Sequence, residues 1–191
     1  MNDVVALHYW PDPCLTSLCA PIADEDFGED LADIGNQMLA LTDRLDGLGL
    51  AAPQVGVLKR FFVMKFSNDT HDPMEPEIIC NPVITDIGEE TDFREEGCLS
   101  LPYIYQQVCR PTEVWIDYQT PFGEHKEMGL LDLEARIVLH EIDHLDGINF
   151  FDARRMPRNL RKQVEAQWKK DGLLSISRSR IRAAGPIAEA A

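Results

Sequence analysis

The sequence predicts an α+β protein with antiparallel β-sheets, a central α-helix and a further helix towards the C-terminus. Two observations support this fold class. Strand-like segments precede the central helix without the regular strand–helix alternation of a parallel sheet. The central helix itself is apolar around most of its circumference, which is typical of a helix covered on all sides. With 191 residues the chain is long enough for one domain with its own core.

The elements are expected in a simple order along the chain. Apolar residues recur at helical spacing over residues 27–45, just before Gly47. Runs of β-branched and aromatic residues then predict strands at residues 61–66, 82–85, 103–108 and 114–118. The polar, proline-containing stretch 67–77 is predicted to be a loop.

The central helix carries the most informative motif, His140-Glu141-Ile142-Asp143-His144. Residues four apart lie on one face of a helix, so both histidines point the same way and can bind one transition metal. Glu141 would lie beside that metal, where it could accept a proton from a bound water. Chance alone also produces this motif, but buried imidazoles and a buried carboxylate need partners, and a metal supplies one.

A catalytic metal usually has three protein ligands, so a third is needed. No histidine follows His144. Glu165, 21 residues downstream, is the position from which a thermolysin-like protease could supply a carboxylate, although a solvated helix charge is the simpler interpretation. Upstream, Cys98 lies in a segment bounded by Gly97 and Pro102, where a bend could aim a thiolate at the metal. Spacing alone leaves both ligands open.

A third segment, Gly47 to Gly56, follows the first helix and is rich in small residues. Its simpler interpretation is a helix end and a closely packed turn. Its functional interpretation lets a substrate backbone approach, with the amide of Gln54 donating to a developing oxyanion. The segment lacks the Gly-Lys-Ser/Thr ending of a phosphate-binding loop.

Taken together, residues 47–54, 96–100 and 140–144 resemble the three motifs of the peptide deformylase family, in the same order. The resemblance covers roughly residues 5–170 and includes Pro11-Asp12-Pro13 and Arg110-Pro111. Leu139 departs from it, because many members have glutamine before the first histidine, and a hydrogen bond near the ligands is therefore in doubt.

The resemblance implies a bacterial-type enzyme that removes the formyl group from the initiator methionine of nascent peptides and releases formate. Small sheets would enclose the metal-bearing helix. Cys98, His140 and His144 would hold one divalent ion, and Glu141 would act as general base and acid. Gln54 and the backbone N–H of Leu99 would stabilise the oxyanion. Many members use Fe²⁺ in the cell and accept Zn²⁺, Ni²⁺ or Co²⁺.

Helix spacing suggests where methionine would bind. Leu133 and Ile137 precede His140 by seven and three positions and share its face. We expect them to form one apolar wall of the pocket, with Leu48 and Gly49 opposite. Ordinary core packing is the rival interpretation for all four positions.

Charge divides the chain. Residues 1–152 carry a formal charge of −22, whereas residues 153–182 carry +8. The acidic body should repel nucleic acid, and DNA is not an expected partner. Residues 157–170 predict a basic helix with one apolar stripe, within a catalytic domain of residues 1–170. We expect a flexible tail over residues 171–191. The resemblance suggests that the basic helix binds the ribosome.

Two other function classes remain open, a thermolysin-like endopeptidase and a metal- or ribosome-binding protein without turnover. The presence of both Glu141 and Gln54 argues against the second. Five cysteines without a Cys-x-x-Cys pair argue against a disulfide framework. With no secretory signal and no bilayer-spanning apolar run, the sequence predicts a cytoplasmic protein without a membrane partner.

Overall fold

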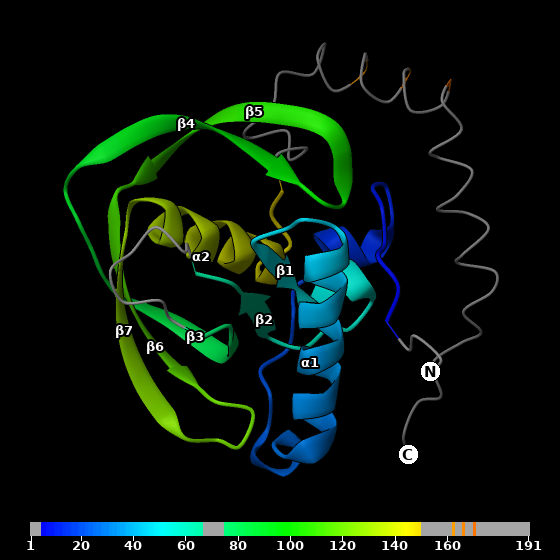
Figure 1. Cartoon of the computed structure of the whole chain (residues 1–191), viewed down its shortest axis with the longest axis vertical. Coiled ribbons are helices and arrows are strands. Elements are labelled where there is room, and N and C mark those ends of the chain that lie inside the picture. The colour runs from blue at the N-terminus through cyan, green and yellow to red at the C-terminus, as the bar shows by residue number, and fades with distance from the viewer. Residues whose placement is uncertain (1–4, 67–74, 150–161, 163–165, 167–169, 171–191) are drawn as a thin grey trace.

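The computed structural model describes residues 5–66 and 75–149, together with Lys162, Ala166 and Lys170 (Figure 1). Its helices are α1 (Glu29–Arg44) and α2 (Asp132–Leu145), and its short 3-10 helices are η1 (Pro13–Thr16), η2 (Asp24–Asp26) and η3 (Ala52–Val55). Its strands are β1 (Gly49–Ala51), β2 (Phe61–Met64), β3 (Glu77–Ile87), β4 (Thr91–Cys98), β5 (Leu101–Pro111), β6 (Glu113–Gln119) and β7 (His125–Leu131).

The strands form two separate antiparallel sheets. One has five strands in the order β1-β2-β3-β6-β7, and the other is the hairpin β4–β5. The antiparallel α+β class predicted from the sequence is therefore confirmed.

Strand β2 of the larger sheet is buried on both faces. Along β2, Phe61 and Val63 pack into the core that contains α1, whereas Phe62 and Met64 pack into the core that contains α2. Since neighbouring side chains of a strand point to opposite faces, a strand covered on both sides is a continuous apolar run. This explains why residues 61–64 show no alternation of apolar and polar residues and are all buried.

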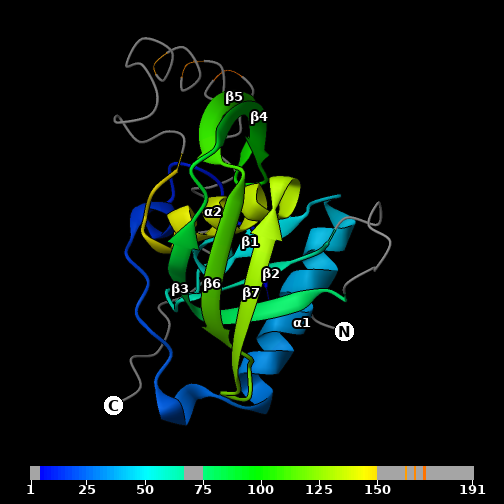
Figure 2. The same ribbon diagram turned by 90° about the vertical axis from the view of Figure 1, so that its left-hand side faces the viewer.

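Helix α2 lies between the two sheets. Figures 1 and 2 show the hairpin β4–β5 on one side of α2, and the strands of the larger sheet on the other. The contacts of α2 extend to β1, β2, β6 and β7 of the larger sheet and to β5 of the hairpin. Thus the prediction that antiparallel sheets enclose a central helix is confirmed. In the described part of the chain, no helix has the length and hydropathy needed to cross a bilayer.

The predicted elements match the structure with three omissions. The helix expected over 27–45 is α1. The strands predicted at 82–85, 103–108 and 114–118 lie within β3, β5 and β6, whereas the strand predicted at 61–66 extends two residues beyond β2. The predictions missed β1, β4 and β7, because β1 has only three residues and the other two expose most of their side chains.

The described residues include only part of the C-terminal segment. Apart from Lys162, Ala166 and Lys170, which are helical and exposed, the basic helix predicted for 157–170 lies outside the described residues, as does the tail predicted for 171–191. Glu165 is also outside them. The proposed domain boundary at residue 170 stays a prediction.

Candidate metal centre

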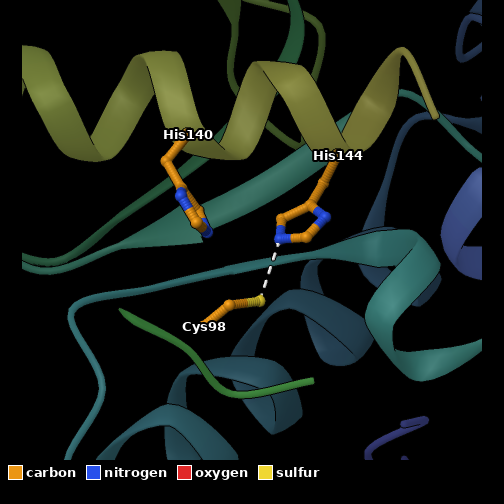
Figure 3. A group of neighbouring side chains, drawn as sticks. All are labelled: Cys98, His140 and His144. Atoms are coloured by element: carbon orange, nitrogen blue, oxygen red, sulfur yellow. Dashed lines mark hydrogen bonds between the residues drawn. The ribbon is translucent and has the colours of Figure 1, made fainter. Parts of the chain in front are cut away.

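The hairpin and α2 bring one thiol and two imidazoles together (Figure 3). The candidate ligand atoms of Cys98, His140 and His144 all lie within 4.8 Å of one another. The Cys98 Sγ atom is 3.2 Å from Nε2 of His144. Cys98 therefore lies close to the histidine pair in the fold, although it precedes His140 by 42 positions in the sequence.

The two histidines are held by the geometry of α2. They are one helical turn apart, and their ring centroids are 4.9 Å apart with an angle of 81° between the ring planes. Both rings extend from the same side of the helix towards Cys98. Such converging imidazoles can share one ion without a change in the backbone.

Cys98 is placed by the end of the hairpin. It is the last residue of β4, and a register shift between Gly97 and Cys98 leads into the turn at Leu99–Ser100. The N-terminal segment holds this turn from outside, because the backbone N–H of Trp10 donates to the Ser100 carbonyl at 3.1 Å. The sequence-based expectation of an ordered bend at Cys98 is therefore confirmed.

A buried carboxylate, Glu96, orients the first imidazole. His140 Nδ1 donates to Glu96 Oε2 at 3.0 Å, which leaves Nε2 of this ring for a metal. Arg110 donates two hydrogen bonds to the same carboxylate, at 2.5 and 2.9 Å, and a third to Asp143 Oδ2 at 2.9 Å. Although burial disfavours its charge, the hydrogen bonds from His140 and Arg110 lower the pKa of Glu96 to about 2. Glu96 is thus an anion that accepts from His140.

The surroundings shift the pKa values of the two imidazoles in opposite directions. Burial alone would lower the pKa of His140, but hydrogen bonds with Cys98 and Glu96 raise it to about 10. Burial and the charge on His140 hold the pKa of His144 well below its usual range. A thiolate with two imidazoles is a donor set that suits zinc or ferrous iron rather than magnesium or calcium.

Glu141 lies next to this cluster but is not part of it. Its Oε2 atom is buried and has no hydrogen-bond partner among the described residues. Burial raises the pKa of Glu141 to about 7, against the opposing effects of His140 and Arg110. Gly49 of β1 packs directly on this carboxylate, and a Cβ atom there would collide with Oε1. An unpaired carboxylate with a pKa near neutrality can both accept and return a proton.

Gln54 is held with its amide nitrogen towards the cluster. Its Oε1 accepts a hydrogen bond from the backbone N–H of Ala51 at 2.7 Å, which fixes the orientation of the amide. Its Nε2 donates to Ser100 Oγ at 3.1 Å and lies 3.5 Å from Cys98 Sγ. The structure therefore brings Gln54 to the site, as the sequence suggested.

These residues open into a pocket of about 660 Å³ whose lining includes Gln54, Cys98, His140 and Glu141. Leu48, Gly49 and Leu99 also line it. The remaining apolar lining comes from Leu7, Tyr9, Leu45, Leu101, Pro102, Ile104 and Tyr105.

Leu133 and Ile137 do not line this pocket, and the structure corrects that expectation. Ile137 is 8 % exposed and packs in the core between α2 and the larger sheet. Leu133 is 36 % exposed, on the first turn of the helix. They share a helix face with His140, but Ile137 packs on the larger sheet and Leu133 is exposed at the start of the helix.

Several residues of the site were missed by the sequence analysis. The roles of Glu96, Ser100 and Asp143 depend on partners that are distant in the sequence. Arg110 was noted only as part of a motif. Leu139, where glutamine was expected, is buried in the apolar core.

A second group, His8, Asp12 and Cys14, also has its ligand atoms within 4.8 Å of one another. The Asp12 carboxylate already binds His8 Nδ1 at 2.8 Å and the backbone N–H of Cys14 at 3.1 Å. Burial and the neighbouring Asp12 raise the pKa of the Cys14 thiol. The cluster at Cys98 has the unpaired carboxylate beside it and is the better candidate for a catalytic metal.

Comparison with known proteins agrees with this geometry. Residues 4–160 match the family described as Polypeptide deformylase. The peptide deformylase of Thermosynechococcus vestitus is 38 % identical over 165 residues, which is 86 % of either chain.

Solved structures show the same fold. The peptide deformylase of Ehrlichia chaffeensis has a TM-score of 0.81 and 29 % identity, covering 91 % of this chain and 99 % of that one. A Met-Ala-Ser-bound class I type b peptide deformylase from Acinetobacter baumannii has a TM-score of 0.74 and 32 % identity, covering 82 % and 100 % of the respective chains.

The cluster predicts that metal binding stabilises the protein through Cys98. A ligand present at about 1,000 times its dissociation constant adds roughly 4 kcal/mol to the free energy of unfolding. We expect Zn²⁺ or Co²⁺ to raise the melting temperature of the metal-free protein, and Cys98→Ser to remove most of this increase.

Cys109→Ser is the matched control, because Cys109 is an exposed thiol on the neighbouring strand. Both variants, and Glu165→Ala, are measured by calorimetry and metal analysis. If Glu165→Ala loses the metal while Cys98→Ser retains it, the third ligand is the downstream carboxylate.

Proposed function

The chain belongs to the polypeptide deformylase family, and from this premise we propose that Cys98, His140 and His144 bind the metal ion of the enzyme. It is a metal-dependent hydrolase that removes the N-formyl group from the initiator methionine of nascent polypeptides. The observation that supports the site best is the approach of Cys98 Sγ to within 3.2 Å of His144 Nε2, beside the buried Glu141.

The metal supplies one kind of chemistry. When bound, a divalent ion of this kind polarises a carbonyl and lowers the pKa of water from about 15.7 towards about 7. The side chains of the protein carry out the proton transfers. Glu141 accepts the proton of the attacking water and later gives it to the amine that leaves. Its pKa of about 7 suits both steps at neutral pH.

Two donors would stabilise the charge that develops on the formyl oxygen. Gln54 Nε2 is fixed next to Cys98 by the hydrogen bonds of its amide. We propose the backbone N–H of Leu99, in the turn that follows Cys98, as the second donor. Each donor of this kind typically contributes about 3–4 kcal/mol to lowering the barrier.

We propose that the methionine side chain and the peptide backbone bind along Leu48 and Gly49. Gly49 packs on Glu141, so a substrate that follows β1 passes close to the proposed base. Leu48 is 42 % exposed and lies in the pocket lining, where a thioether side chain can cover it. The related structure from Acinetobacter baumannii is bound to Met-Ala-Ser. This supports a pocket that binds a peptide beginning with methionine.

For the metal we propose Fe²⁺ as the native ion, with Zn²⁺, Ni²⁺ or Co²⁺ as substitutes. A thiolate and two imidazoles suit each of these ions. Fe²⁺ bound to a thiolate would make the enzyme sensitive to oxygen, so the choice of metal is tested by anaerobic purification and metal analysis.

We also propose that the basic C-terminal segment binds the ribosome, which would keep the enzyme near emerging formylated termini. The charge of +8 over residues 153–182 is suited to ribosomal RNA. Lys162 and Lys170, two of its cations, are exposed. This location places the enzyme in the cytoplasm, where its free cysteines would stay reduced.

The first test measures formate release from a formyl-Met peptide by the anaerobically purified protein. Glu141→Gln removes the proposed base but no ligand, so we expect a loss of about 10²–10⁴-fold in kcat with unchanged metal content. Glu95→Gln, an exposed carboxylate beside Glu96, is the matched control and should behave as the unmodified enzyme. Full activity of Glu141→Gln would assign the base to another residue, and a fully loaded enzyme without formate release would contradict the proposed function.

The second test measures co-sedimentation with ribosomes at low and high salt. Deletion of residues 157–191 should abolish it, whereas deletion of residues 183–191, which contain no basic residue, should leave it unchanged. Arg161→Gln with Lys162→Gln should weaken it without truncation. Activity on a free peptide shows that each variant is folded. Equal co-sedimentation of all variants would show that the basic segment is not the ribosome-binding element.

A further inference from the structure

The proposed metal ligands belong to two separate parts of the fold. Cys98 is carried by the hairpin β4–β5, which forms its own sheet and shares no ladder with the five-stranded sheet. His140 and His144 are carried by α2. The ladders of the two sheets therefore do not by themselves set the distance between the thiol and the imidazoles, and contacts between the hairpin and the helix contribute to it.

One side chain of α2 reaches both strands of the hairpin. Arg136 Nη1 donates to Glu96 Oε1 of β4 at 2.7 Å and to the Val108 carbonyl of β5 at 3.0 Å. Its Nη2 donates to the Asp92 carbonyl of β4 at 3.2 Å and also to the Asp92 carboxylate. The planar guanidinium is the group that can make such a set of bonds at once, and a lysine cannot.

Arg136 is buried with its main partner. The side chains of Arg136 and Glu96 are 6 % and 5 % exposed, so their charges are shielded from water. Removing one partner of a buried ion pair leaves the other uncompensated, which costs far more than the loss of an exposed pair. Breaking the contact between Arg136 and Glu96 is therefore costly.

The position of Arg136 along α2 relates this contact to the metal centre. Arg136 lies one turn before His140, and Asp143, three residues after His140, is bonded to Arg110 of β5. Ion pairs of Arg136 and of Asp143 thus join the helix to the hairpin on either side of His140. Arg136 and His140 also share Glu96, the carboxylate that orients the imidazole.

We propose that Arg136 is a positioning residue of the metal centre, which holds the hairpin, and with it the Cys98 sulfur, against the two imidazoles of α2. This proposal rests on the proposed metal site. It adds a residue that helps the protein to retain the metal but contacts neither the metal nor the substrate. Its loss lets the hairpin move away from α2, so that the thiolate bond weakens before the imidazole bonds do.

The test uses Co²⁺-loaded protein with two readouts, the rate of release to a chelator and the thiolate-to-cobalt absorption band. Arg136→Met keeps the length of the side chain and removes its charge and donors. We expect release about 10–100-fold faster, the usual effect of losing a group that supports a ligand, and a weakened thiolate band. Arg136→Lys should recover only part of both.

Arg94→Met is the matched control, because Arg94 also binds the Asp92 carboxylate and pairs with Asp132 of α2, but both contacts lie at an exposed side chain that does not reach Glu96. Exposed ion pairs of this kind contribute little to stability. This variant should behave as the unmodified protein. A folded Arg136→Met variant with unchanged release rate and absorption band would overturn the proposal.

If Arg136→Met does not fold, Asp92→Asn provides the test. This substitution weakens the contact between Arg136 and β4, and it leaves the guanidinium of Arg136 paired with Glu96. The proposal then requires faster release than from Arg94→Met, and an equal rate contradicts it. Since neither readout uses formate release, the proposal can fail while the assigned activity stands, and the reverse also holds.

Discussion

The site depends on one buried carboxylate, that of Glu96. It accepts hydrogen bonds from Arg110 and Arg136 and from the imidazole of His140. A carboxylate in an apolar interior is costly unless its lone pairs are filled, and here several donors fill them. Because the carboxylate stays ionised, His140 must donate through Nδ1, which leaves Nε2 for the metal. One interaction therefore joins the hairpin to the helix and fixes the tautomer of a ligand.

The rest of the fold provides the surroundings for this interaction. Strand β2 of the five-stranded sheet is buried on both faces, and one face packs into the core that contains α2 while the other packs into the core that contains α1. Strand β1 brings Gly49 against Glu141, and the helical turn after it brings Gln54 against Ser100. The N-terminal segment holds both regions from outside, since His8 N–H donates to the Gln54 carbonyl at 2.7 Å and Trp10 N–H to that of Ser100. The result is a site whose proposed ligands, base and oxyanion donor come from different parts of the chain but have little freedom.

The sequence predicted the elements with strong periodicity and the residues with distinctive chemistry. Helix α2, its histidines and Glu141 follow from local spacing, and Cys98 and Gln54 could be assigned once three motifs were combined. Strands β4 and β7 were missed because their side chains are mostly exposed and show no apolar alternation. Ile137 was placed in the pocket because a helix face was assumed to border one environment along its length, whereas its turn packs on the sheet. The role of Arg136 was hidden because its partner Glu96 lies 40 residues away. The one local signal of such a partner was a charged residue within the apolar run 135–139 of the helix.

The most direct test of this account is X-ray absorption at the metal edge of the loaded enzyme. The account predicts one sulfur ligand at about 2.3 Å and two imidazole nitrogens at about 2.0–2.1 Å around a single ion. Cys98→Ser should remove the sulfur signal, and Cys14→Ser and Cys109→Ser should leave it in place. A spectrum with only nitrogen and oxygen ligands, or a sulfur signal that persists in Cys98→Ser, would contradict the account.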